Sequence, residues 1–144
     1  MFIRDILGAK GRPVISIGPE QSVKGALALF VEHNIGSLPV VDASGQLIGI
    51  FSERDVLFGI HHDFERFHHR YIKEVMTSNP ITCGPNNTLA EATGKMARHR
   101  VGQLPVVDGS ELVGLVSIGD LVKSLYEQVD AENRLLMDYL HGRS

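Results

Sequence analysis

The chain has 144 residues, of which 43% are hydrophobic and 22% charged, the composition of a globular protein long enough to bury its own core. Its formal charge of −3 and isoelectric point near 6.1 lack the basic excess that nucleic-acid binding requires, so we expect no nucleic-acid partner. The single cysteine, Cys83, excludes an intrachain disulfide and a cysteine-based zinc site. Because there is neither a membrane-spanning apolar run nor a signal-peptide pattern, we expect a cytoplasmic protein without membrane contact.

The first elements of the chain have counterparts in its second half. Residues 2–7 are an aromatic residue, an isoleucine, a base, an acid and two large apolar residues, and residues 71–76 repeat this order type for type. Residues 13–19 and 80–85 each begin with a proline, continue through apolar residues and end in Gly-Pro. Each of these two segments predicts a short buried strand.

A helix is expected next in each copy. Ser22 is an N-cap residue, and Gly36 ends the apolar pattern that follows it. In the second copy Thr88 and Glu91 form a capping box, and Gly102 ends the pattern. The expected buried faces follow helical spacing and consist of Val23, Ala26, Leu27, Phe30 and Val31 in the first copy, and of Leu89, Ala92, Met96 and Ala97 in the second.

The clearest repeat comes after these helices. Gly-Ser-Leu-Pro-Val-Val-Asp at residues 36–42 returns as Gly-Gln-Leu-Pro-Val-Val-Asp at residues 102–108, 66 residues later. Gly-Ile-Phe-Ser-Glu-Arg-Asp at residues 49–55 returns as Gly-Leu-Val-Ser-Ile-Gly-Asp at residues 114–120, but 65 residues later. A one-residue deletion between two apolar runs is tolerated in a hairpin loop and not in a strand. Each copy therefore predicts a hairpin, followed by a second helix that starts at Ser52 or Ser117.

Two segments lie outside the repeat. Residues 59–70 link the copies and carry His61, His62, His68 and His69, whose spacing fits no zinc pattern, so we expect a solvated linker. Apolar residues at helical spacings predict one long helix from residue 121 to about residue 140, longer than a repeat needs. We divide the chain into repeats at 1–66 and 67–128 and a helical extension at 129–144. The extension is interpreted as a surface for a partner, most simply a second copy.

The order strand, helix, strand, strand, helix, present twice with both motifs, resembles a tandem pair of cystathionine-β-synthase (CBS) domains, also called a Bateman module. The likeness covers residues 2–125 and is greatest to stand-alone bacterial CBS pairs with Ser-Glu-Arg-Asp in one repeat and Ser-Ile-Gly-Asp in the other. The resemblance implies an α/β (α+β) fold in which two β-α-β-β-α repeats pack through their sheets about a pseudo-two-fold axis. It also implies a homodimer, and an adenine nucleotide or related adenosyl ligand (AMP, ADP, ATP, NAD or S-adenosylmethionine) bound between the repeats as a regulatory ligand.

The residues allow such a ligand. An aspartate at the third helical position, Asp55 or Asp120, is placed to accept hydrogen bonds from ribose hydroxyls, and Ser52 or Ser117 with the first helical N–H groups favours a phosphate. Arg54 adds a cation in the first copy, whereas Gly119 replaces it in the second, for which Arg98 and Arg100 are candidates. By resemblance, adenine is expected against Ile15, Ser37, Leu38 and Pro39 in one copy and against Ile81, Gln103, Leu104 and Pro105 in the other.

Other interpretations of the same residues remain open. Each Ser-x-x-Asp sequence also fits a capping box that only satisfies backbone N–H groups. A protein without ligand that acts as a scaffold through its C-terminal helix and dimer surface is the alternative function. Because the sequence contains no nucleophile–base pair, no glycine-rich phosphate loop and no cluster of metal ligands, we expect neither an enzyme nor a metal site.

Overall fold

The computed structural model describes residues 1–142 and consists of two similar halves. The first contains α2 (Val23–His33), β1 (Ser37–Val41), β2 (Leu47–Ser52) and α3 (Glu53–Asp63), and the second contains α5 (Leu89–His99), β4 (Gln103–Asp108), β5 (Glu111–Ser117) and α6 (Ile118–Leu140). The remaining elements are α1 (Ile3–Lys10), η1 (Phe67–His69), α4 (Ile72–Val75) and the two-residue strand β3 (Thr77–Ser78). This α+β architecture is the one that the repeat predicts.

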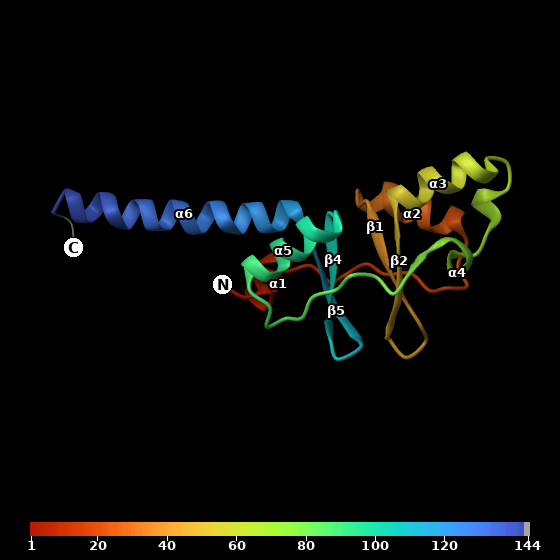
Figure 1. The fold of residues 1–144 in the computed structure, drawn as a ribbon, viewed down its shortest axis with the longest axis horizontal. Coiled ribbons are helices and arrows are strands. Elements are labelled where there is room, and N and C mark those ends of the chain that lie inside the picture. Colours follow the sequence, from red (N-terminus) through yellow and green to blue (C-terminus); the bar gives the residue numbers. More distant parts are fainter. Residues whose placement is uncertain (143–144) are drawn as a thin grey trace.

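The two predicted hairpins are present, each with an irregularity at the same place. Strands β1 and β2 are antiparallel with a register shift at Val40/Val41, and β4 and β5 have theirs at Val106/Val107. The hairpin tips bond to one another, since the N–H of Leu47 donates to the carbonyl of Ser110 at 3.1 Å. Figure 1 shows the two hairpins side by side, with helices at the end opposite their tips. The halves thus meet through their sheets, as the fold prediction requires.

The first predicted strand of each copy is reduced to a single bridge. Ile17 pairs with Val40, and Cys83 pairs with Val106, both in parallel. The N–H of Ile17 donates to the carbonyl of Pro39 at 3.0 Å, but the next bond along a parallel ladder would need a donor at Pro39 itself. Proline has no N–H, and Pro105 interrupts the second copy in the same way. The prediction of regular strands at residues 13–19 and 80–85 is therefore wrong.

Each of the short helices α1 and α4 packs against the half of the chain that follows or precedes it across the repeat boundary: α1 packs on the second half, and α4 packs on the first. Ile3 and Ile6 of α1 belong to the core that contains α5, β4 and β5, whereas Ile72 of α4 belongs to the core that contains α2, β1 and β2. Equivalent bonds hold both helices, because Ile3 donates to the carbonyl of Asn87 at 2.9 Å and Ile72 donates to that of Gln21 at 2.8 Å. The chain start is thus built into the second core. Cys83 lies in that core too, and burial raises the pKa of its thiol.

Helix ends differ in detail from the prediction. The Ser22 hydroxyl accepts from the N–H of Gly25 at 3.1 Å and Thr88 forms its capping box with Glu91, as predicted. The helices end, however, at left-handed Asn34 and Arg100, two residues before the expected glycines. Gly36 lies beside the flexible side chain of Glu53, at the start of α3.

Val31 was expected in the buried face of the first helix but is 83% exposed.

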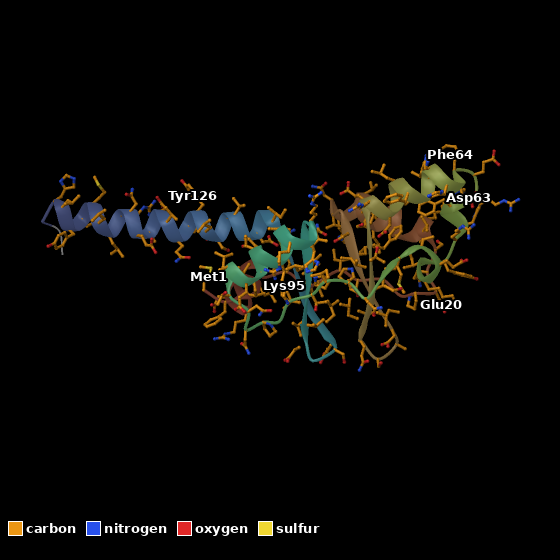
Figure 2. The ribbon with its side chains drawn as sticks, viewed as in Figure 1. Met1, Glu20, Asp63, Phe64, Lys95 and Tyr126 are labelled. Carbon is orange, nitrogen blue, oxygen red and sulfur yellow. The ribbon has the colours of Figure 1, made fainter. Side chains whose placement is uncertain are left out.

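The long C-terminal helix is present and projects away from the body (Figure 1). It runs without a break from Ile118 to Leu140, and only Leu121 is buried. Figure 2 shows Tyr126 on this helix pointing away from the rest of the chain. The expected extension at 129–144 is helical to Leu140, and its residues 143–144 lie outside the described part.

The linker is not wholly solvated. Phe67 of η1 is only 3% exposed and contacts the ring of Phe51 at a centroid distance of 6.4 Å. Segment η1 contacts both α2 and α3, and a Cβ on Gly59 would collide with the Phe67 ring. Phe64, in the same linker, points outward at the end of the molecule far from α6 (Figure 2).

Candidate functional site

Two clefts lie between the halves, and each draws on both of them. The first has a volume of about 770 Å³ and contains the start of α3 together with the end of α5 and the start of β4. Its lining includes Ser37, Ser52, Arg54, Asp55, Thr77, Ile81, Arg100 and Gln103. The second, of about 410 Å³, contains the start of α6 together with the ends of α1 and α2. Its lining includes Lys10, Arg12, Ile15, His33, Asn34, Ser37, Gln103, Ser117 and Asp120.

In the first cleft, Asp55 is held by neutral donors. Its Oδ2 accepts a hydrogen bond from the N–H of Ser52 at 2.9 Å and one from the Ser52 hydroxyl at 3.2 Å. Its Oδ1 accepts from the exposed hydroxyl of Thr77 at 3.0 Å. Asp55 therefore caps α3. Because a hydroxyl is easily exchanged for another, Oδ1 remains accessible to a ligand hydroxyl.

In the second cleft, Asp120 is held by a cation. Its Oδ2 accepts from the N–H of Ser117 at 2.9 Å and from the ammonium of Lys10 at 2.9 Å, and Lys10 also donates to the carbonyl of Leu115 at 3.0 Å. Burial alone raises the pKa of Asp120, but the bonds from Lys10 and Ser117 outweigh it, so that the pKa lies below its usual value. The carboxylate is thus ionised and paired at neutral pH.

The structure distributes the predicted adenine-wall residues over both clefts. The sequence assigned Ile15 with Ser37 to one copy and Ile81 with Gln103 to the other, but Ile15 lies in the second cleft and Ile81 in the first. Ser37 and Gln103 border both. The side chains of Leu38, Pro39, Leu104 and Pro105 are fully buried and line neither cleft.

The cations are also placed differently from the prediction. Arg98 and Arg100 were candidates for a cation beside Asp120, but Arg100 lies in the first cleft with Arg54, and exposed Arg98 lies in neither. The reason is the crossed geometry, since the end of α5 faces the start of α3 and not the start of α6. The end of α2 faces Asp120 instead, and it carries Asn34 where α5 carries Arg100.

The sequence did not lead us to predict Lys10 and Arg12 as residues of a cleft. A signal was present, because five residues separate Leu7 from Pro13 whereas three separate the matching Met76 from Pro80. The longer segment lets α1 extend to Lys10, while the shorter one leaves the helix at Val75 and forms β3. The two segments therefore bring a lysine to Asp120 and a threonine to Asp55.

The wall shared by the clefts contains two orphaned polar atoms. Ser37 Oγ and Gln103 Oε1 are buried without a hydrogen-bond partner among the described residues. These positions are equivalent in the two repeats and begin β1 and β4. Buried polar groups normally have a hydrogen-bond partner. A molecule or water bound against this wall could therefore form hydrogen bonds with these two atoms.

Neither a metal site nor a membrane span is found within residues 1–142. No group of three or more potential metal-ligating side chains occurs there, and His61, His62 and His69 are exposed. No helix in the same residues is both long and apolar enough to cross a bilayer.

Comparison with known proteins follows the same division of the chain. The family model of the CBS domain matches residues 3–62 and again residues 72–127. A CBS domain-containing protein of Bacillus subtilis, YhcV, is 35% identical over 108 residues, which are 75% of this chain and 76% of that protein. An inosine-5′-monophosphate dehydrogenase of Korarchaeum cryptofilum is 42% identical over 111 residues, but the match covers 76% of this chain and only 22% of that enzyme.

Solved structures agree with this. A CBS-domain containing protein of Agrobacterium tumefaciens superimposes with a TM-score of 0.79 at 34% identity, covering 85% of this chain and 91% of that one. A CBS domain pair in complex with 5′-methylthioadenosine and S-adenosyl-L-methionine gives 0.77 at 28% identity, covering 89% and 98%. CBSX2, in complex with AMP, gives 0.75 at 25% identity, covering 88% and 96%.

Proposed function

The chain belongs to the CBS-domain family, and we propose that it is a regulatory module that binds an adenosine-containing ligand, such as AMP, ADP, ATP, NAD or S-adenosylmethionine, between its repeats. The observation that carries the proposal is the first cleft, where an accessible aspartate, two guanidinium groups and an orphaned polar wall surround about 770 Å³. Ligands of this class are present in two structurally similar CBS proteins.

Each part of the first cleft suits one part of such a ligand. The Oδ1 atom of Asp55 accepts from a ribose hydroxyl in place of the Thr77 hydroxyl. Arg54 and Arg100 come from opposite halves and offer charge to a phosphate between them. A ligand held by both halves fixes their relative angle. It biases any conformational equilibrium by its difference in affinity for the two states.

A thermal-shift screen of the full chain against AMP, ADP, ATP, NAD and S-adenosylmethionine tests the proposal. A ligand at about 100 times its Kd stabilises the fold by about 2.7 kcal/mol, a shift of several degrees for a chain of this size. Asp55→Asn keeps an acceptor for the Ser52 N–H, and therefore the cap, but loses the charge, so the shift should shrink strongly. If none of the five raises the melting temperature at millimolar concentration, the binding proposal is wrong.

We assign the role to regulation and not to catalysis. The hydroxyls of Ser52 and Thr77 do contact the Asp55 carboxylate, but this carboxylate also accepts the Ser52 N–H as the cap of α3, so we interpret these contacts as structural. The dehydrogenase relative matches this chain over only about a fifth of its length, so its activity is not transferred. Turnover of any of the five probes by the purified chain would contradict this assignment.

A second candidate, a scaffold that acts through its C-terminal helix, is favoured by the exposed apolar stripe of α6. Val122, Leu125, Val129 and Leu136 recur at spacings of three, four and seven and are each more than half exposed. An apolar groove of about 260 Å³ lies beside this stripe, between α5 and α6. We propose that a second copy covers both.

Helix length supports a second copy as the occupant. Two α6 helices that pair antiparallel over their full length place Val129, the midpoint of Ile118–Leu140, opposite itself. The free half of each helix then lies along the other copy's groove, with Leu136 opposite Val122. The stripe is apolar in both halves of the helix. The same surface on two copies is therefore complementary to itself in this antiparallel arrangement.

The oligomeric state tests this pairing. The wild type should sediment as a dimer, and Leu136→Lys should sediment as a monomer with an unchanged circular dichroism spectrum. Val129→Cys should form a disulfide-linked dimer under mild oxidation, whereas Glu127→Cys, on the opposite helix face, should not. If the wild type sediments as a monomer, the proposed dimer is wrong.

A further inference from the structure

We propose that Lys10 makes the second cleft the weaker of the two ligand sites, because its ammonium neutralises part of the charge of Asp120 that would attract a ligand hydroxyl. This inference rests on the proposed function and adds an order of occupancy that the paired motifs do not contain. The first cleft fills first, and the second fills at a higher ligand concentration.

The difference lies in the charge that each aspartate can offer to a ligand. The partner of Asp55 Oδ1 is the exposed hydroxyl of Thr77, and a ligand hydroxyl replaces it like for like. The partner of Asp120 Oδ2 is an ammonium at 2.9 Å, whose positive charge offsets the negative charge of the carboxylate. Asp120 is therefore the weaker acceptor for a ligand hydroxyl.

Lys10 is also held from a second side. It donates to the carbonyl of Leu115 on β5 at 3.0 Å, so its ammonium is fixed between a strand and the start of α6. The pair is only part-exposed, with side-chain exposures of 30% for Lys10 and 23% for Asp120. The ammonium therefore stays beside Asp120 when a ligand enters this cleft of about 410 Å³, which has roughly half the volume of the other.

The chain offers a matched control. Lys73 forms an ion pair of similar length, 3.0 Å to Glu20, and α4 that carries it is the counterpart of α1. Lys73 lines neither cleft. Lys73→Met therefore removes a lysine–carboxylate pair without touching a ligand site.

The test is calorimetric titration of the full chain with AMP, which has the ribose hydroxyls and one phosphate in a small molecule. We expect a tight and a weak site that differ at least about tenfold in Kd. Asp55→Asn should remove the tight site, and Asp120→Asn should leave it intact. Lys10→Met should strengthen the weak site about twofold to fivefold, the range of a part-exposed ion pair, while Lys73→Met should change neither site.

The opposite results are equally definite. Loss of the tight site in Asp120→Asn would reverse the order of the clefts and overturn the inference. A weak site that becomes weaker in Lys10→Met, and also in Lys10→Gln, would show that Lys10 binds the phosphate of AMP and would overturn the inference. Absence of AMP binding to the wild type and to both Lys10 variants would instead contradict AMP binding itself, a failure that the thermal-shift screen detects independently.

Discussion

The two halves of the chain share their hairpins and capping aspartates but differ in the segments that connect them. Asp55 faces Thr77 in the first cleft, whereas Asp120 faces Lys10 in the second. Both partners come from outside the repeated motif, from residues 8–12 and 77–79, where the copies differ in length. The two repeats thus share their caps, while the segments in which they differ make the two clefts unequal.

The outer helices show the same kind of difference. In the first half, Phe67 of the linker packs against α2 and α3 and joins the core. In the second half, the matching helices α5 and α6 leave an open apolar groove lined by residues such as Met96, Leu121 and Leu125. The first half therefore covers part of its helical face with its own chain, whereas the second half leaves the corresponding face open.

Removing the aromatic contact of the linker should have the largest effect on this comparison. Phe67→Ala deletes a ring that is 3% exposed, and we expect it to lower the free energy of unfolding by about 3–5 kcal/mol. Phe64→Ala, in the same linker but 76% exposed, should stay within about 0.5 kcal/mol of the wild type. Urea unfolding followed by circular dichroism measures both. Equal losses in the two variants would show that Phe67 is not part of the core.

The helix ends that face the clefts allow a second, smaller test. Arg100 has a φ of 54°, a left-handed conformation that asparagine tolerates better, and Asn34 holds the equivalent position with a φ of 52°. Arg100→Asn should raise the free energy of unfolding by up to about 1 kcal/mol. It should also raise the Kd of AMP in the first cleft about tenfold, because a guanidinium is lost. Asn34→Arg should destabilise the fold by a similar amount.

Denaturation and calorimetry on the same samples separate the two effects. If Arg100→Asn binds AMP as tightly as the wild type, Arg100 is not a ligand contact.

The sequence was sufficient to predict the elements whose signal is local. Hairpin turns, N-caps at Ser22 and Thr88, and the long α6 follow from spacing and capping chemistry, and all are present. The prediction of regular strands at residues 13–19 and 80–85 was wrong because a ladder depends on the partner strand, and there Pro39 and Pro105 lack the N–H that would extend it. A strand's own apolar pattern contains no information about that donor.

The site was predictable in its residue types but not in its grouping. Ser52, Asp55, Ser117 and Asp120 each lie in a cleft, because a helix start is a local feature. Which arginine shares a cleft with which aspartate depends on how the two copies cross, and Arg100, a candidate for the cleft of Asp120, lines the cleft of Asp55 instead. Lys10 reaches Asp120 across 110 residues of chain, through the packing of α1 onto the other half. Only the three-dimensional exchange of α1 and α4 reveals this contact.

The smallest expected effect concerns the charge at Asp120. Lys10→Met removes the ammonium that helps hold the pKa of Asp120 below its ordinary value of 3.8. A carboxyl whose pKa is lowered by folding stabilises the fold above its ordinary pKa, and this contribution disappears as the pH falls through the lowered value. Lys10→Met should therefore reduce the free energy of unfolding by up to about 1 kcal/mol at pH 7, and by progressively less below about pH 4. Urea unfolding at pH 7 and pH 3 measures the difference, and Lys73→Met serves as the control for loss of a lysine. A deficit of the same size at both pH values would show that Lys10 stabilises the fold through its other bond, to Leu115, and not through the charge of Asp120.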